Sequence, residues 1–502
     1  MTLQWINELW GHFDKYHGRL NTSAAGHYYF AMLFAKCISD RWEDSLLDYQ
    51  QKYKGDKAII ERKMERERFV LNENFNFDYI FRNRFDPDIG GIINRTLGRI
   101  EEANQQKLEG IFGFVDFNSE YDLGETRERN DFLMTLVEVF ARVNLGRNAN
   151  VPISEVAEDC LVAFDLHINA AKGREFYTPR EICNLMSELL SPKKGDSIYD
   201  PTCGTGGFLL AASRRVADET GRPSRDYALY GQEKSKQVCS LAKMNLYLHD
   251  LDSVYLSPGD AIVNPEWKED GRPMKFDIVA SQIPFSVNAW GMELLNSSEL
   301  ADRFPWGIPP SRKGDYAFIE HILGSINYKG RAGVLVPQGV LFREGREQLI
   351  RRNIIDQNLL EAVIGLPANL LFHTGIPCAI LLFNKDKGQQ KDILFINAAG
   401  GFESGKRQNR LLDEHINKIV RTYRNFKKSV PAMEKAFSRV VRIEEIVAAD
   451  YNLNISRYFD GHDGPAADGI DVPALEAEIA ALEKDLAALK RSLEKEYKDL
   501  KK

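Results

Sequence analysis

The segment from Asp200 to Phe208, Asp-Pro-Thr-Cys-Gly-Thr-Gly-Gly-Phe, places an acidic residue and a run of glycines directly after the apolar pair Ile198 and Tyr199. A glycine turn lets the backbone approach a ligand closely, and a helix that begins there turns free N–H groups toward that ligand. The spacing differs from the Gly-x-Gly-x-x-Gly of dinucleotide folds, and the sequence has no Gly-x-x-x-x-Gly-Lys-Ser/Thr phosphate loop. The segment therefore favours a nucleotide-type cofactor other than NAD or ATP, with an ordinary strand-to-helix turn as the alternative.

Two further acidic residues close later apolar stretches. Glu233 ends Leu229-Tyr-Gly-Gln-Glu233, where a carboxylate could accept both hydroxyls of a ribose. Asp260 ends Leu256-Ser-Pro-Gly-Asp260, where it could accept from an adenine amino group. Each acid alone would be a common loop residue. Acids at successive ends of parallel strands converge on the carboxyl edge of the sheet, where ligands of such folds bind.

The elements that would position these residues begin at about residue 171, where short apolar runs alternate with amphipathic stretches. The runs are Ser197–Tyr199, Ala228–Gly231, Ser253–Leu256, Phe276–Ser281, Ala332–Pro337 and Leu359–Leu366. Strands that alternate with helices predict an α/β domain with a largely parallel sheet covered on both faces. Ala379–Asn384 and Ile393–Asn397 are apolar enough to add strands, which could lie antiparallel at the sheet edge.

The two ends of the chain have different patterns. Up to about residue 170, apolar residues such as Leu9, Phe13 and Tyr16 recur at helical spacing, which predicts a helical N-terminal domain over 1–170. We expect the α/β domain over 171–459 and a linker rich in Gly, Pro and Asp over 460–472. In the tail, 473–502, apolar residues alternate spacings of four and three: Leu475, Ile479, Leu482, Leu486, Leu489 and Leu493. This spacing favours a coiled coil with another chain or domain over a helix packed on its own chain.

The composition excludes several classes to which the protein could belong. The chain has 502 residues and a formal net charge of −7, so any DNA binding must be local or shared with a partner. Six cysteines stand singly at positions 37, 160, 183, 203, 239 and 378, which predicts neither disulfides nor a metal site. No stretch approaches the roughly 20 apolar residues of a membrane helix. The start lacks the features of a signal or transit peptide, so we expect a cytoplasmic protein without membrane contact.

A series of short motifs runs along the chain. Besides the glycine segment, they are Trp10–Glu43, Glu175-Phe-Tyr-Thr-Pro-Arg180, Gly231-Gln-Glu233, Leu241-Ala-Lys-Met-Asn-Leu246, Gly314-Asp-Tyr-Ala-Phe318, Gly365-Leu-Pro-Ala-Asn369 and Asp450-Tyr-Asn-Leu-Asn454. In these motifs and their order, the chain resembles the modification subunit of type I restriction-modification systems, an adenine N6 DNA methyltransferase that works with a separate specificity subunit. The resemblance runs nearly end to end and implies a Rossmann-like domain that binds S-adenosylmethionine.

The resemblance also implies a set of cofactor-binding residues. They are Glu175, Phe176, Tyr177, Thr178, Pro179, Arg180, Asp200, Thr202, Gly204, Thr205, Gly206, Gly207, Phe208, Glu233 and Asp260. Tyr177–Pro179 would line the methionine end of S-adenosylmethionine, and Asp200 with the glycines would surround its amino acid portion. Glu233 would hold the ribose and Asp260 the adenine. For Phe176–Tyr177 the residues alone leave an alternative, core packing ahead of a helix that starts near Pro179.

The predicted catalytic residues are Gln282, Ile283, Pro284 and Phe285, which follow the strand Phe276–Ser281. In the family this strand ends in Asn-Pro-Pro-Phe or Asn-Pro-Pro-Tyr. The target adenine must leave the duplex stack to be reached, and an aromatic side chain then stacks on it. The amide oxygen and the carbonyl of the next residue accept from its N6 amino group, which aims the nitrogen lone pair at the methyl group.

Two positions depart from this motif. Gln282 keeps the amide but is one methylene longer, and Ile283 keeps a carbonyl but loses the ring that stiffens the loop. A displacement of about 1 Å can cost on the order of a hundredfold in rate, which puts activity in doubt. The sequence leaves open an adenine methyltransferase, active or weakened, and a noncatalytic scaffold or cofactor-sensing subunit of a DNA-defence complex. Methylation of protein or another nucleobase has less support.

The partners follow from the resemblance as well. The chain has no zinc finger, basic zipper or concentrated basic helix for reading DNA, so a specificity subunit would supply the sequence recognition. A second modification subunit and a restriction (translocase) subunit would complete the complex. Arg312–Lys313, Arg343–Arg352 and Lys406–Arg410 could touch phosphates, although solvated surface is the more frequent explanation for such clusters.

Overall fold

The computed structural model of the chain describes residues 2–16, 21–147, 153–168, 177–216, 220, 222–372, 374–405, 408–430, 434 and 436–459. The chain forms two compact units, Met1–Ile455 and Ser456–Lys502. In the second unit the described residues form only α18 (Ser456–Phe459). The predicted linker over 460–472 and coiled coil over 473–502 lie outside the described residues.

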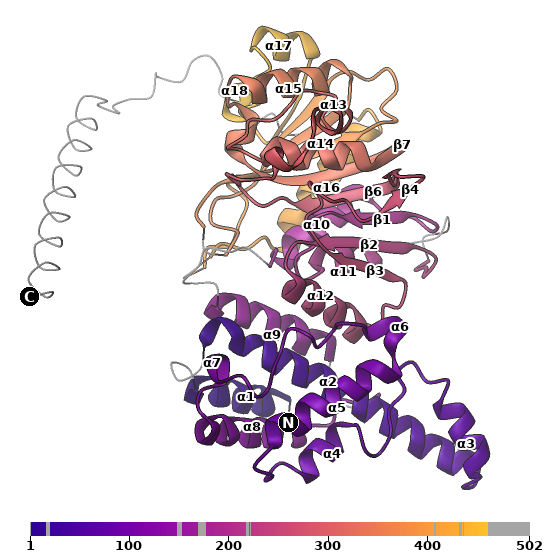
Figure 1. Cartoon of the computed structure of the whole chain (residues 1–502). Coiled ribbons are helices and arrows are strands. Elements are labelled where there is room, and N and C mark those ends of the chain that lie inside the picture. The colour runs from indigo at the N-terminus through magenta and orange to yellow at the C-terminus, as the bar shows by residue number, and fades with distance from the viewer. Residues whose placement is uncertain are drawn as a thin grey trace, which may run out of the picture. The chain divides into compact units, whose positions relative to one another are not determined.

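The N-terminal part of the larger unit consists of helices, as the apolar spacing predicted (Figure 1). They are α1 (Thr2–Tyr16), α2 (Thr22–Lys52), α3 (Lys57–Met64), α4 (Phe77–Arg82), α5 (Ile89–Ala103), α6 (Gln105–Leu108), α7 (Glu120–Leu123), α8 (Thr126–Ala141) and α9 (Ile153–Ile168). Their common core is rich in aromatic rings, and Phe34 lies fully buried with its ring centroid 5.9 Å from that of Phe69. None of the helices that the structure describes is both long enough and apolar enough to cross a membrane.

A nine-stranded sheet follows, in the order β11-β10-β8-β9-β7-β6-β1-β2-β3 among the described residues. The strands are β1 (Ser197–Asp200), β2 (Ala228–Glu233), β3 (Val254–Pro258), β6 (Phe276–Gln282), β7 (Ile326–Pro337), β8 (Leu360–Gly365), β9 (Cys378–Asn384), β10 (Ile393–Asn397) and β11 (Ser438–Val441). A small hairpin, β4 (Lys268–Glu269) and β5 (Arg272–Pro273), stands apart from this sheet. The neighbours from β3 to β7 all pair in parallel, so the ends of β1, β2, β3 and β6 meet at one edge.

The positions of β9 and β10 differ from the expectation for an antiparallel edge. β9 is antiparallel, but it lies inside the sheet between β7 and β8 and is buried along its whole length. β10 pairs in parallel with β8, and the unpredicted β11 forms the antiparallel edge. Only residues 366–377 separate β8 from β9, and the described residues among them form no helix, so the chain turns back beside β8. The uninterrupted apolar sequence of β9 suits a strand covered on both faces.

Helices cover both faces of this sheet, as predicted for an α/β domain. They are α10 (Arg180–Leu190), α11 (Gly207–Ser213), α12 (Lys236–Leu248), α13 (Ser297–Arg303), α14 (Asp315–Ser325), α15 (Arg346–Asp356), α16 (Asp413–Lys427) and α17 (Ile443–Ala448), with short 3₁₀ helices η2 (Met292–Leu294) and η3 (Gln338–Leu341). Ile198 of β1 packs in the core that includes α10, α11, α12 and α16. The next residue, Tyr199, contacts His321 of α14, and neighbouring residues of a strand point to opposite faces.

Helix α12 contributes to two cores. Met244 and Tyr247 pack with the helical N-terminal part, whereas Leu246 packs with the helices and strands of the sheet. Arg68 reinforces the first contact, because its guanidinium donates to the Tyr247 carbonyl at 2.9 Å and pairs with Asp252 at 2.7 Å. The N-terminal helices and the sheet are therefore joined through one shared helix.

Candidate functional site

The loop after β1, residues 201–206, is termed here the glycine turn. Gly204 and Gly206 have φ angles of 53° and 84°, in the left-handed region that glycine adopts without a steric penalty. The side-chain amide of Asn245, on α12, donates to the Thr205 carbonyl at 2.9 Å. Helix α11 begins directly after the turn, so the free amides of its first residues lie at the loop.

Asp200 ends β1 with its side chain buried. The carboxylate accepts from the Ser281 hydroxyl at 2.8 Å and from the Thr202 amide at 3.1 Å. Burial raises the pKa of Asp200 to about 7, against the lowering effect of these two hydrogen bonds. This carboxyl group ties the end of β1 to β6 and titrates near neutral pH.

Glu233 ends β2 and Asp260 follows β3 at the same edge of the sheet. The Glu233 carboxylate accepts from the Gly204 amide at 3.1 Å and from the Ser235 amide at 2.8 Å, and burial raises its pKa. Asp260 forms an ion pair with Lys234 at 2.9 Å. Two carboxylates thus stand side by side where consecutive parallel strands end.

The loop after β6, Ile283–Trp290, is termed here the β6 loop. Thr202 of the glycine turn contacts the Ser281 hydroxyl and donates to the Gln282 carbonyl at 3.0 Å. Because β6 pairs in parallel with β1, both loops leave the sheet at the same edge. The two loops are therefore joined by hydrogen bonds where they leave the sheet.

A cavity of about 390 Å³ lies between the two loops. The predicted residues that line it are Thr178, Thr202, Gly204, Glu233, Asp260, Gln282, Ile283, Pro284 and Phe285. Carboxylates from β2 and β3 form one part of the wall, and Ile283, Pro284 and Phe285 form an apolar part. The volume lies within the range of about 300–1,000 Å³ of pockets for drug-sized ligands.

Comparison with models of protein families identifies the family that has this fold and site. The model of the N-6 DNA methylase family matches residues 153–464, more than half of the chain. The chain belongs to this family. A second model, the HsdM N-terminal domain, matches residues 6–140. S-adenosylmethionine, predicted from the sequence, is the cofactor of this family.

Individual relatives agree with the family. The chain is 32% identical over 377 residues to the methylase subunit of the type I restriction enzyme MjaVIII of Methanocaldococcus jannaschii. The aligned region covers 72% of this chain and 62% of the relative. It is 28% identical over 421 residues to the MpnII methylase subunit of Mycoplasma pneumoniae, and this alignment covers 80% of this chain and 75% of that relative. The chain spans less than two thirds of the length of MjaVIII and of a second Methanocaldococcus relative, MjaVII, at 62% and 59%.

A solved structure supports the fold of the larger unit. The crystal structure of a type I restriction-modification methyltransferase subunit from Streptococcus thermophilus matches with a TM-score of 0.77 and 26% identity. The match covers 92% of this chain and all of that one. The predicted methyltransferase-like α/β fold with a helical N-terminal part is confirmed.

Some predicted cofactor residues of this methylase lie beside the cavity. Tyr177, Arg180, Thr205 and Gly207 line a smaller hollow of about 20 Å³, which Thr178 also lines. Tyr177 packs on the core of the N-terminal helices, and Phe208 is buried in the core on one face of the sheet. Pro179 is the N-cap of α10, as expected for a helix that starts there. Glu175 and Phe176 lie outside the described residues.

An ion-pair cluster surrounds this smaller hollow. Glu158 of α9 pairs with Arg180 at 3.4 Å, Arg214 at 2.7 Å and His249 at 3.0 Å. Burial raises the pKa of Glu158, but the hydrogen bonds from His249 and Arg214 outweigh it and hold the pKa at about 2. A residue of the N-terminal helices thus reaches the neighbourhood of the glycine turn.

Several residues of the site were not predicted from the sequence. Ser281 joins Asp200 to Thr202, and its only sequence signal is a hydroxyl within a buried strand. Lys234 pairs with Asp260, and Trp290 and Phe318 add to the cavity wall. Trp290 lies shortly after the predicted Phe285, and Phe318 ends the motif Gly314–Phe318, so these positions were the available sequence signals.

The basic clusters that could touch phosphates have different surroundings. Arg343 pairs with the buried carboxylates of Asp315 and Glu347. Arg351 is buried and donates to the Tyr451 carbonyl at 2.6 Å. Both side chains therefore stabilise the fold, whereas Arg312 and Lys313 are exposed. Lys406 lies outside the described residues.

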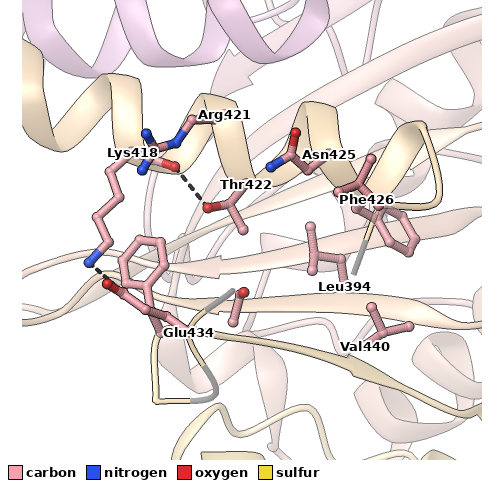
Figure 2. A pocket seen from close by; sticks show the side chains of 11 residues that line it. Leu394, Lys418, Arg421, Thr422, Asn425, Phe426, Glu434 and Val440 are labelled. Atoms are coloured by element: carbon pink, nitrogen blue, oxygen red, sulfur yellow. Dashed lines mark hydrogen bonds and ion pairs between the residues drawn. The ribbon is translucent and has the colours of Figure 1, made fainter. Parts of the chain in front are cut away.

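A second cavity, of about 250 Å³, lies between α16 and the strands β10 and β11. Figure 2 shows Lys418 and Arg421 from α16 at one end and Phe426, Leu394 and Val440 at the other. Lys418 pairs with Glu434 at 2.6 Å. None of the predicted site residues that the structure describes lines this second cavity.

Proposed function

We propose that this chain is the site-specific DNA adenine N6-methyltransferase subunit of a type I restriction-modification complex. The observation that carries the proposal is the 390 Å³ cavity in which Gln282–Phe285 meets Glu233 and Asp260. A cofactor side with two carboxylates and a base side with an aromatic residue and amide oxygens are what methyl transfer to an adenine requires. The family and its relatives support this class of reaction.

The residues around the cavity fit S-adenosylmethionine. When bound, the cofactor supplies an electrophilic methyl group on a sulfonium. Glu233 accepts from two backbone amides, and a carboxylate has about four acceptor positions, so it would also accept from ribose hydroxyls. Asp260 would accept from the adenine amino group of the cofactor. The amides around the glycine turn would approach its amino acid portion, as Tyr177–Pro179 would approach its methionine end.

The β6 loop would receive the target adenine. Phe285 is half-buried beside Pro284, so part of its ring is available to stack on a base that has left the duplex. The side-chain oxygen of Gln282 and the carbonyl of Ile283 would accept from the N6 amino group and hold its lone pair toward the methyl group. Positioning of this kind supplies most of the catalysis that in-line transfer needs.

The partners are part of the same proposal. DNA would be bound through a specificity subunit, with a second modification subunit and a restriction (translocase) subunit in the complex. The type I subunits among the relatives and the net charge of −7 support shared DNA binding. We also propose the domain bounds 1–170, 171–459, 460–472 and 473–502; the two cores of the larger unit support the separation of the first two.

The alternative, a noncatalytic scaffold or cofactor-sensing subunit, rests on Gln282 and Ile283 and on the coiled coil predicted for the tail. The comparisons do not favour it over the methyltransferase. The cavity keeps both carboxylates and Phe285, so the departure from the family motif is confined to two positions. We therefore propose an active methyltransferase rather than a noncatalytic subunit.

Co-expression with its specificity subunit, in a host whose DNA carries no N6-methyladenine, tests the proposal. We expect N6-methyladenine in digested host DNA by mass spectrometry, and one recognition sequence by modification-sensitive sequencing. Phe285→Ala is the matched control and should leave the DNA unmodified. If the double variant Gln282→Asn, Ile283→Pro modifies DNA and the unchanged chain does not, the scaffold alternative is correct.

A further inference from the structure

The backbone of the β6 loop adopts an unfavourable conformation directly after Phe285. Ser286 has a φ angle of 51°, in the left-handed region that residues with a side chain rarely adopt. Such a backbone conformation persists only when contacts from the surrounding structure stabilise it. The first loop position, Ile283, carries no proline ring, so the loop has one internal constraint fewer than the family motif provides.

Asp315, the first residue of α14, holds this position from outside the loop. One of its oxygens accepts from the Ser286 amide at 2.8 Å, and the other pairs with Arg343. Arg343 in turn pairs with Glu347 at 2.9 Å. The Asp315 side chain is fully buried and that of Glu347 is 2% exposed, so the guanidinium between them compensates charge that burial would otherwise penalise.

Residues that precede Asp315 also contact the β6 loop. The Gly314 amide donates to the Val287 carbonyl at 2.9 Å, and the Trp290 indole donates to the Pro310 carbonyl at 2.9 Å. A Cβ atom at position 314 would lie 2.9 Å from the Cβ of Trp290, so glycine is required for this close approach. The segment from Pro310 to Asp315 thus contacts the β6 loop at Ser286, Val287 and Trp290.

We infer that Asp315 and Arg343 are positioning residues that hold the β6 loop in the conformation that presents Phe285 to the target base. They act through Ser286, outside the cavity, and Asp315 is absent from the cavity wall. In this chain the buried pair supplies rigidity that a proline at 283 would otherwise supply. The inference rests on the proposed function, since the loop is assigned the base-binding role there.

Asp315→Asn is the test, with Glu361→Gln as the matched control. Glu361 of β8 is also a buried carboxylate, with hydrogen bonds from Asn384 and Tyr423, but β9 and β7 separate its strand from β6 in the sheet. We expect both variants to lower the melting temperature. Only Asp315→Asn should lower kcat for methyl transfer, by about tenfold to a hundredfold, with cofactor affinity within about twofold.

Two further measurements separate positioning from stability. Adding Ile283→Pro to Asp315→Asn should restore part of kcat without restoring the melting temperature. Hydrogen exchange of the Ser286 amide, measured on the full chain, should be slow in the unchanged protein and in Glu361→Gln and faster in Asp315→Asn. Arg343→Gln should behave like Asp315→Asn and replaces it if that variant does not fold.

The exchange measurement also separates failure of this inference from failure of the proposed function. If the unchanged chain transfers no methyl group, the proposed function fails, and faster exchange at Ser286 in Asp315→Asn still supports the positioning pair. Equal exchange at Ser286 in Asp315→Asn and Glu361→Gln overturns the inference. Equal loss of kcat in these two variants also overturns it, because the effect would then be general destabilisation.

Discussion

The glycine turn and the β6 loop leave the same edge of the sheet, but they are held in different ways. In the glycine turn, Gly204 and Gly206 adopt left-handed backbone angles without a steric penalty, and Asn245 and Glu233 add hydrogen bonds. The β6 loop contains a strained serine and depends on Asp315, which is 29 residues away along the chain. Residue type removes the backbone strain in the first loop, whereas in the second loop a tertiary contact holds a strained residue. Substitutions should therefore affect cofactor binding through the first loop and turnover through the second.

The largest effect is expected in the β6 loop, from Gln282→Ala. Loss of one acceptor that aligns the reacting nitrogen should lower kcat by about a hundredfold or more. Cofactor affinity, measured by calorimetry, should stay within about twofold. Gln348→Ala is the control, because Gln348 bonds to Asp450 outside the cavity. If Gln282→Ala lowered cofactor affinity as much as kcat, the two loops would not have the separate roles proposed for them.

The next effect concerns Asp200, which links both loops through Ser281 and Thr202. Its pKa is raised to about 7, above the unfolded value of about 3.9, so the folded state binds more protons between these values. Its stabilising contribution is present at low pH and is lost as the pH rises toward 7. From pH 5 to 8 we expect about 2–3 kcal/mol less stability from this group. Denaturant unfolding of Asp200→Asn should depend less steeply on pH; an identical slope would contradict the assignment.

A smaller effect is expected from Glu233→Gln at the glycine turn. The neutral amide keeps the shape but weakens hydrogen bonds to a charged acceptor, so cofactor Kd should rise about tenfold. Turnover at saturating cofactor should change less, opposite to Gln282→Ala. Calorimetry and saturation kinetics on the same preparation measure both quantities. A kcat loss without a Kd change would contradict the proposed roles.

The smallest effect is expected from Gly206→Ala. The φ angle of 84° strains any side chain, and a Cβ would lie 3.3 Å from Leu246, so we expect a loss of about 1–2 kcal/mol. Gly324→Ala is the matched control, because a Cβ there meets no atom within 4 Å and alanine favours the helix α14. Thermal unfolding should move in opposite directions for the two variants. An unchanged or higher melting temperature in Gly206→Ala would show that the turn tolerates a side chain.

The sequence predicted the parts of the fold and site that local patterns encode. The apolar runs identified the parallel strands, and the acids at their ends, Glu233 and Asp260, do line one cavity. The antiparallel direction of β9 agrees with the expectation, but its place inside the sheet was missed, because apolarity does not determine the order of strands. Asp315 and Ser281 were given no role, since a hydrogen bond to a distant loop leaves no periodic signal. The residue roles themselves stay predictions until the substitutions above are made.

Helix α12 has a consequence for how such a chain can be divided. Met244 and Tyr247 complete the core of the N-terminal helices, and on the same helix Asn245 holds the Thr205 carbonyl of the glycine turn. A fragment without the N-terminal helices would expose apolar surface and lose support near the turn at the same time. The N-terminal helices are therefore not an exchangeable module, and transplanting them between homologous subunits requires transplanting the matching face of α12.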